Sequence, residues 1–148
     1  MSQTIQITGR KGLSTLAVPR ALAIWETELA PIVLAEIKHR APVGQDSGAG
    51  RLRDSISIER RAAGGGVSVR FVSSVPYATF VENGTGPHRI EPRNARVLHW
   101  TSGGSSAFAH GVNHPGTRPN PFARKAIESL MPLLSQRLRA DITKELEL

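Results

Sequence analysis

The first clear pattern along the chain is a stripe of apolar residues at steps of three and four, which predicts an amphipathic helix that starts near Val18. Pro31 should kink or split this helix, because proline removes one backbone donor and crowds the preceding turn. Pro42 should end it, because the residue before a proline is pushed out of the helical region. The stripe consists of Val18, Leu22, Trp25, Leu29, Ile32, Val33 and Ile37.

A second stripe of the same spacing predicts a long amphipathic helix near the C-terminus. Asn120 can cap this helix, Pro121 suits its first turn, and Pro132 should bend it. The apolar positions are Phe122, Ala126, Ile127, Leu130, Leu133, Leu134, Leu138, Ile142 and Leu146.

Between the two helices the apolar residues alternate with polar ones, which indicates half-buried strands. Alternation over residues 52–61 and again over 67–71, with a glycine-rich turn between them, predicts a β-hairpin. Residues 2–8 predict a short strand. Residues 89–100 predict one or two more, with Pro92 marking a break or an edge.

These elements predict a single α+β domain over residues 1–148, with an antiparallel sheet of about four or five strands packed against an N-terminal helix and a long C-terminal helix. Residues 1–17 are expected to form an N-terminal extension, and residues 44–50 and 101–113 to form flexible loops. For residues 101–113 the alternative is two strand ends around a mobile tip. The expected core of the sheet includes Ile56, Ile58, Val67, Val69, Phe71, Tyr77 and Phe80.

Composition narrows the class of protein. The chain has 148 residues, enough for one domain with its own core, and no cysteine, which excludes disulfides, thiolate zinc sites and cysteine nucleophiles. The N-terminus lacks a basic start followed by an apolar run, and no segment has the roughly 18 apolar residues of a membrane span. We therefore expect a soluble protein that is made in the cytoplasm and has no signal peptide.

The net charge of the chain is +7, from 19 basic and 12 acidic residues. Such a surplus favours contact with nucleic acid or with an acidic protein, although a merely solvated surface would show it too. The basic residues are scattered, and no recognition-helix or RNA-binding aromatic pattern accompanies them. Candidate contacts to DNA or to an acidic partner are Arg51, Arg53, Arg60, Arg61 and Arg70.

Four histidines in the second half of the chain raise the question of a metal site, because zinc can be held by imidazoles alone. Two of them, His110 and His114, are four residues apart, but the neighbouring Gly111 and Pro115 disfavour a helix that would put them on one face. No HExxH motif is present. We expect no metal and no cofactor, and packing or loop roles for His88, His99, His110 and His114.

The sequence shows no catalytic motif. The glycines at 84 and 86 are followed by Pro87, which offers no amide to a phosphate, and residues 103–107 do not match a nucleophile elbow. Glu82 is the one carboxylate that we would test for acid–base chemistry. The role that we expect of it is capping, or pairing with an arginine at the corner, within the chain or across an interface. We therefore expect that the protein is not an enzyme.

Two corners rich in glycine and proline frame the middle of the chain, and without catalytic groups around them we interpret them as an assembly surface rather than a reactive site. The first follows an apolar run, and the second leads into the C-terminal helix. The residues assigned to these corners are Tyr77, Glu82, Gly84, Thr85, Gly86, His114, Pro115, Gly116, Thr117, Pro121 and Phe122.

Three motifs occur in a fixed order along the chain. They are Ala41-Pro42-Val43 with Arg51-Leu52-Arg53-Asp54-Ser55-Ile56, then Tyr77-Ala78 with Val81-Glu82 and Gly84-Thr85, then Val112 with His114-Pro115-Gly116-Thr117, Pro121-Phe122 and Ala126. Together they resemble the neck and tail-completion proteins of long-tailed, lambdoid-type bacteriophages, from about residue 18 to residue 135. The loop at 44–50 and Ala123 depart from the family pattern.

The resemblance implies a structural virion protein without enzymatic activity, which forms or joins a ring at the head–tail junction and in which a tail-terminating role is possible. Implied partners are further copies of the chain in a six-fold or twelve-fold ring, neighbouring head-completion and tail-tube proteins, and DNA in the channel, with no membrane. Rigid corners suit the heterologous interfaces of a ring. Two alternatives stay open: a basic nucleic-acid-binding module and a histidine-dependent metalloenzyme.

Overall fold

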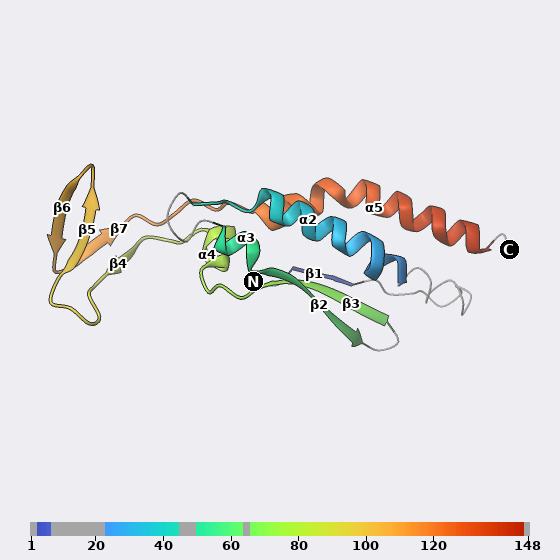
Figure 1. The fold of residues 1–148 in the computed structure, drawn as a ribbon, viewed down its shortest axis with the longest axis horizontal. Coiled ribbons are helices and arrows are strands. Elements are labelled where there is room, and N and C mark those ends of the chain that lie inside the picture. The colour runs from blue at the N-terminus through green and yellow to red at the C-terminus, as the bar shows by residue number, and fades with distance from the viewer. Residues whose placement is uncertain (1–2, 7–22, 45–49, 64–65, 147–148) are drawn as a thin grey trace. The chain divides into compact units, whose positions relative to one another are not determined.

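The computed structural model describes residues 3–6, 23–44, 50–63 and 66–146 (Figure 1). As predicted, the protein is of the α+β class, with a long C-terminal helix and small antiparallel sheets. Two compact units can be distinguished. Unit 1 comprises Met1–Ala78 and Pro121–Leu148, and unit 2 comprises Thr79–Asn120. The strands of the described residues are distributed over three sheets, one in unit 1 and two in unit 2.

The sheet of unit 1 has the strand order β1-β3-β2 and is antiparallel throughout. β1 (Gln3–Gln6) confirms the short strand expected near the N-terminus. β2 (Ile56–Ala63) and β3 (Gly66–Ser73) confirm the hairpin. Ile58 stands opposite Phe71, and the next pair along the hairpin, Glu59 and Arg70, lies on the other face of the sheet.

The strand prediction that began at Leu52 is wrong at its start. Leu52 lies in a single helical turn, α3 (Arg51–Asp54), and the strand begins only at residue 56. Gly50 precedes the turn with a φ of 84°, and its carbonyl accepts the Asp54 N–H at 2.8 Å. Leu52 is still buried. An apolar residue four positions before a strand therefore reaches the core from a helical turn as well as from an extended chain.

The helix predicted near the N-terminus is described from Ala23 onward, and its earlier part, with Val18, lies outside the described residues. It starts with the π-helical turn η1 (Trp25–Leu29) and continues as α2 (Ala30–Arg40). The Ala30 N–H donates to the carbonyl of residue 25, five positions back, directly before Pro31. The change from π-helix to α-helix thus occurs next to Pro31. Proline has no backbone N–H to donate, and its ring crowds the preceding turn. Residue 41 is extended before Pro42, and the helix ends where predicted.

α5 (Phe122–Leu146) forms the second long helix, and it continues through Pro132. α5 packs along α2, and both helices lie on the same side of the sheet in Figure 1. Antiparallel packing is fixed by Arg40 Nη2, which donates to the Ser129 hydroxyl at 3.3 Å, and by Arg137, which lies 3.4 Å from the carboxylate of Glu28. The core of unit 1 includes Trp25, Leu29, Val33, Ile37, Leu52, Ile56, Val69, Phe71, Phe122, Ala126 and Leu134.

Unit 2 contains most of α4 (Ala78–Asn83) and two separate two-stranded sheets. One pairs β4 (His88–Ile90) with β7 (Val112–His114), and the other pairs β5 (Leu98–Ser102) with β6 (Ser105–Ala109). The strand expectation for residues 89–100 is confirmed.

Residues 101–113 supply parts of three strands, so the loop predicted there is wrong. The alternative of two strand ends agrees with the pairing of β5 with β6. Gly103 and Gly104 have φ values of 58° and 83°, so both central residues of the β5–β6 turn take the left-handed conformation. A two-residue turn of this kind closes a tight hairpin, and glycine adopts it without steric cost. Residues 45–49 of the other predicted loop lie outside the described part.

Candidate functional site

The two glycine- and proline-rich corners pair with each other. The Thr85 N–H donates to the carbonyl of Thr117 at 3.0 Å, and the Thr117 N–H donates to the carbonyl of Thr85 at 3.1 Å. The two hydroxyl oxygens lie 2.9 Å apart, within hydrogen-bond distance. We call the paired segments 84–88 and 114–117 the clasp. The glycine- and proline-rich parts of the two predicted corners therefore form one structure within unit 2.

Two glycines make this close approach possible. Gly84 has a φ of 71°, and a Cβ atom at this position would lie 2.4 Å from the Thr117 carbonyl oxygen. Gly116 has a φ of 88°, and a Cβ there would lie 2.2 Å from the Thr85 carbonyl oxygen. Each glycine thus leaves room for the backbone of the opposite segment. No other residue type fits at either position without moving that backbone.

The clasp has the same four residues on both sides, in reverse order. Thr85-Gly86-Pro87-His88 on one segment faces His114-Pro115-Gly116-Thr117 on the other. Antiparallel pairing places threonine opposite threonine at one end and histidine opposite histidine at the other, in a single register. The two prolines between these pairs carry no N–H, so they contribute no donors to the ladder.

The histidines at the end of the clasp are held by backbone groups. His88 Nδ1 lies 3.0 Å from the Gly86 carbonyl oxygen, to which it can only donate. His114 Nδ1 lies 3.0 Å from the Gly116 nitrogen and accepts its proton, so the neutral ring of His114 carries its own proton on Nε2. The ring centroids are 5.1 Å apart. A metal on Nε2 of His114 would displace that proton to Nδ1, against the Gly116 N–H, so the pair is poorly suited to chelation.

The other two histidines of unit 2 stand elsewhere. His99 stacks on Phe108 across the β5–β6 hairpin, with centroids 4.7 Å apart, and His110 Nδ1 lies 3.2 Å from the Arg96 carbonyl oxygen. Within residues 3–6, 23–44, 50–63 and 66–146, no group of three or more histidine, aspartate or glutamate side chains is placed to hold a metal ion. The imidazoles serve packing and turn formation.

The expectation that Tyr77 and Phe80 lie in the core is wrong, because their side chains are 39% and 58% exposed. α4 explains the difference. Ala78 and Glu82, one helical turn apart, are both buried, and Phe80 stands about half a turn from them and faces outward. Glu82 is only 2% exposed, so it does not present a carboxylate to a dissolved substrate.

The base of unit 2 is closed beyond the clasp. The Asn120 N–H donates to the carbonyl of Val81 at 2.9 Å, which joins the end of the unit to α4. Pro121 and Phe122, the last two corner residues predicted, belong instead to unit 1. There the Pro121 carbonyl accepts the Lys125 N–H at 3.0 Å and Phe122 is buried, so both serve the start of α5.

The five arginines predicted as partner contacts do not form one patch. Arg53 donates to the Asp54 carboxylate at 2.9 Å, and this hydrogen bond holds the pKa of Asp54 below its ordinary value and raises the pKa of Arg53. Arg60 lies opposite a buried valine and Arg70 opposite a glutamate, on opposite faces of the sheet. Arg51 is exposed on α3, and the side chain of Arg61 lies outside the described part.

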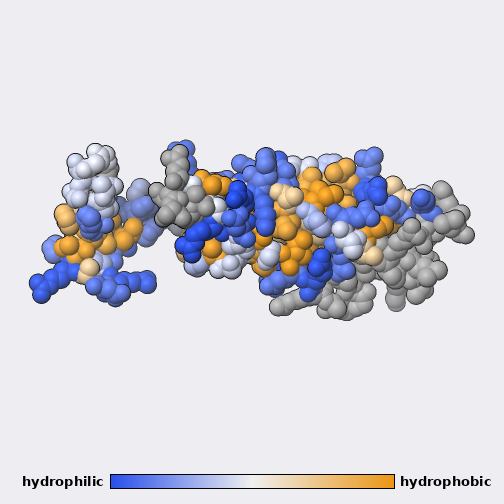
Figure 2. All heavy atoms as spheres, in the orientation of Figure 1, coloured by the Kyte–Doolittle hydropathy of each residue, from blue (hydrophilic) through white to orange (hydrophobic). Residues whose placement is uncertain are grey.

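The exposed aromatic surface of unit 2 was not predicted. Phe108 is 65% exposed and Trp100 is 42% exposed, on opposite faces of the β5–β6 hairpin. Figure 2 shows hydrophobic residues, in orange, at the surface of unit 2 beside hydrophilic residues in blue. The signal in the sequence is Gly103-Gly104, a two-residue hairpin turn between short alternating runs.

Comparison with known protein families identifies the class of protein. Residues 10–84, just over half of the chain, match the family model HK97-gp10_like, described as "Bacteriophage HK97-gp10, putative tail-component". The chain belongs to this family, and it is a phage tail-related structural protein of the virion. The resemblance to phage neck and tail-completion proteins is thereby confirmed at the level of the family.

Searches of curated proteins and of solved structures give no match to the chain. No helix in the described part of the chain is long and apolar enough to cross a bilayer.

Proposed function

We propose that this tail-related protein forms or joins a ring at the phage head–tail junction, as a neck or tail-completion protein or as the protein that terminates the tail. The observation that carries the proposal is the surface of unit 2. Each of its two sheets has only two strands, so every strand presents an edge, and Phe108 stands exposed on one of them. Open strand edges and exposed aromatic side chains are typical of surfaces that another chain covers.

The clasp supports the same proposal. Two threonine backbones, two hydroxyls and two positive-φ glycines hold the base of unit 2 in one geometry. A surface that is already ordered before association loses less conformational entropy on binding. In a ring, one patch of each copy meets a different patch of its neighbour, and a rigid base suits this requirement.

A structural rather than enzymatic role agrees with the site and with the family. Glu82, the carboxylate proposed for acid–base chemistry, is buried. Nδ1 of His114 accepts the Gly116 N–H, so Nε2 of the neutral ring carries the proton and has no lone pair for a metal. These two observations weigh against the metalloenzyme alternative.

The proposal is tested by measuring mass by light scattering and imaging the protein by electron microscopy, alone and with its head-completion and tail-tube neighbours. The wild-type chain should form a ring or join one. Phe108→Ala should weaken that association about tenfold or more, as loss of an interface aromatic does. Ser106→Ala, on the same strand and the same face of β6, should leave it unchanged.

Both variants must keep the circular dichroism spectrum of the wild type. Monomers in isolation are compatible with the proposal, because a template can be required. Failure of the wild-type chain to join a ring with its neighbours present would refute it. Rings that form equally well with Phe108→Ala would show that the hairpin is not the interface.

A basic nucleic-acid-binding module is the second candidate, favoured by the net charge of +7. It requires affinity for duplex DNA that falls steeply with salt, because each neutralised phosphate releases counterions. The separation of Arg60 and Arg70 onto opposite faces of the sheet weighs against one continuous basic path there.

A further inference from the structure

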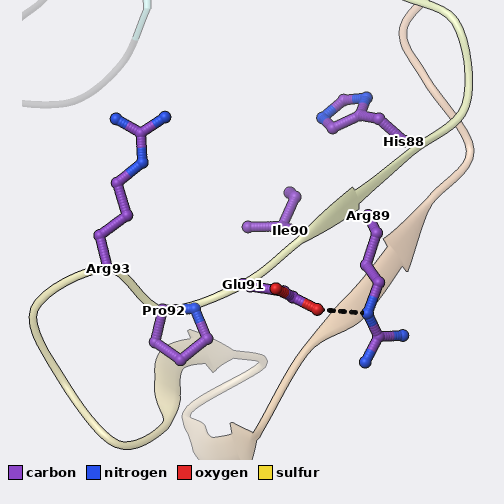
Figure 3. Close-up of a pocket in the computed structure, with 6 residues that line it drawn as sticks. All are labelled: His88, Arg89, Ile90, Glu91, Pro92 and Arg93. Atoms are coloured by element: carbon purple, nitrogen blue, oxygen red, sulfur yellow. Dashed lines mark hydrogen bonds and ion pairs between the residues drawn. The ribbon is translucent and has the colours of Figure 1, made fainter.

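A hollow of about 690 Å³ lies beside β4 in unit 2, and six consecutive residues line it. The strand sorts these residues by side. Figure 3 shows His88, Ile90 and Arg93 extending from one side of the chain and Arg89 and Glu91 from the other. Alternation along an extended chain accounts for the sides of residues 88 to 91. Arg93 lies beyond the end of β4, after Pro92, so alternation along the strand does not set its direction.

Of the charged residues that line the hollow, Arg89 and Glu91 pair with each other and Arg93 does not. Arg89 Nε donates to the Glu91 carboxylate at 2.8 Å, and Arg89 Nη1 donates to the Asn113 side-chain oxygen at 3.4 Å. The only carboxylate of the lining is therefore neutralised by the arginine beside it. Arg93 is exposed and has no acidic partner among the described residues, so its positive charge is available to a ligand.

The rest of the lining is apolar or able to hydrogen-bond. Ile90 and Pro92 are half-buried and make up the apolar part of the lining. His88 Nδ1 is engaged with the Gly86 carbonyl, which leaves Nε2 as the free nitrogen of an exposed ring. A cation, an imidazole and a small apolar surface thus occur together within six residues.

We propose that this hollow binds an acidic side chain of a partner protein, an aspartate or glutamate next to an apolar residue. The carboxylate would pair with the Arg93 guanidinium, which matches its planar geometry with two parallel donors. The apolar neighbour would cover Ile90 and Pro92. The inference rests on the proposed function, because it names the chemistry of a neighbour in the virion.

A protein carboxylate fits this hollow better than the backbone of DNA does. Duplex binding needs several cations along a phosphate path, typically six to ten contacts in a tight complex. The lining has one unpaired permanent cation, Arg93, two apolar residues and the carboxylate of Glu91. A single acidic side chain with an apolar neighbour requires only one cation and a small apolar surface, and the lining has both.

The test is a titration of the full chain, followed by nuclear magnetic resonance at the Arg93 Nε–Hε group and the Ile90 methyl groups. The probe is the peptide acetyl-Leu-Glu-Leu-amide. It should shift both resonances to saturation, at millimolar concentration. The isosteric peptide acetyl-Leu-Gln-Leu-amide should produce no saturable shift, because it lacks the charge.

Two arginine variants distinguish binding in the hollow from nonspecific electrostatic attraction between the peptide and the basic protein. Arg93→Gln should weaken binding of the glutamate peptide about tenfold or more, which is the loss of about 1.4 kcal/mol expected for one charge-assisted hydrogen bond. Arg96→Gln removes the same charge from the same loop but does not line the hollow, and it should change the affinity less than twofold. Equal effects of the two variants would overturn the proposal.

Two further outcomes would also overturn it. The first is an absence of saturable shifts, or shifts of the same size with the glutamine peptide. The second is tighter, strongly salt-dependent displacement of the same resonances by a duplex DNA, which would assign the hollow to phosphate. The titration uses the isolated chain in solution. The ring proposal is tested instead by microscopy and light scattering. The ring proposal and the proposal for the hollow can therefore fail independently of each other.

Discussion

At the scale of single residues, the clasp depends on two glycines that each make room for the other segment. Gly84→Val should destabilise unit 2 by about 3 kcal/mol or more, because a β-branched side chain disfavours positive φ and its Cβ would meet the Thr117 carbonyl oxygen at 2.4 Å. Urea unfolding, followed through amide resonances of unit 2, measures this loss.

Gly86→Ala is the matched control for this substitution. A Cβ at residue 86 would have no atom within 4 Å, and no positive φ constrains the position. The alanine variant should stay within about 1 kcal/mol of the wild type. If the valine variant at 84 folds and assembles like the wild type, the close approach in the clasp is not required.

The Arg53–Asp54 pair gives a second prediction at this scale. The hydrogen bond from Arg53 holds the pKa of Asp54 below its ordinary value, so the pair stabilises the fold above that ordinary value and the contribution is lost as pH falls through the lowered one. Arg53→Gln should raise the pKa of Asp54, measured by carboxyl carbon shifts in an acid titration. Arg51→Gln, on the same turn, should leave the pKa nearly unchanged, and an equal rise would indicate a general field instead.

At the scale of elements, the start of α5 depends on one buried aromatic ring. Phe122→Ala should cost about 3–5 kcal/mol of unfolding free energy, because it leaves a cavity in the core of unit 1. Leu133→Ala on the same helix should cost under about 1 kcal/mol, since that side chain is 52% exposed. Chemical denaturation monitored by circular dichroism gives both values. A loss under 1 kcal/mol for Phe122→Ala would mean that the ring does not contribute to the core.

Periodicity predicted the elements whose pattern is long. The stripes of α2 and α5 and the alternation of β2 and β3 each extend over enough residues to define one buried face. β6 and β7 were not predicted as separate strands, because each is only three to five residues long. Tyr77 and Phe80 were misplaced because apolar character alone does not say which side of a single helical turn faces inward.

The candidate site was predictable in its parts and not in its pairing. Both corners were recognised from glycine and proline, but their contact joins residues 32 positions apart, and local patterns carry no such information. The reversed order of four residues on the two segments was the available signal. The hollow beside β4 depends on side-chain directions, which only the structure shows.

At the scale of the whole molecule, the family match ends close to the start of unit 2. The match covers residues 10–84 and ends where the clasp begins. It covers η1, α2, α3, the β2–β3 hairpin and α4, whereas β1 precedes it and the two sheets of unit 2, the hollow and α5 follow it.

The nested pairing of unit 2 has a consequence for how its chain entropy is lost. The turn at 103–104 closes the smallest loop, the β4–β7 pair closes the next, and the Thr85–Thr117 pair and the bond from Asn120 to Val81 follow outward. Each closure brings the next two segments near each other, so each later loop is effectively short. Although residues 81 and 120 are far apart in sequence, only a short loop remains to be closed once the inner pairs have formed. We therefore expect unit 2 to fold from the 103–104 turn outward to the Asn120–Val81 bond.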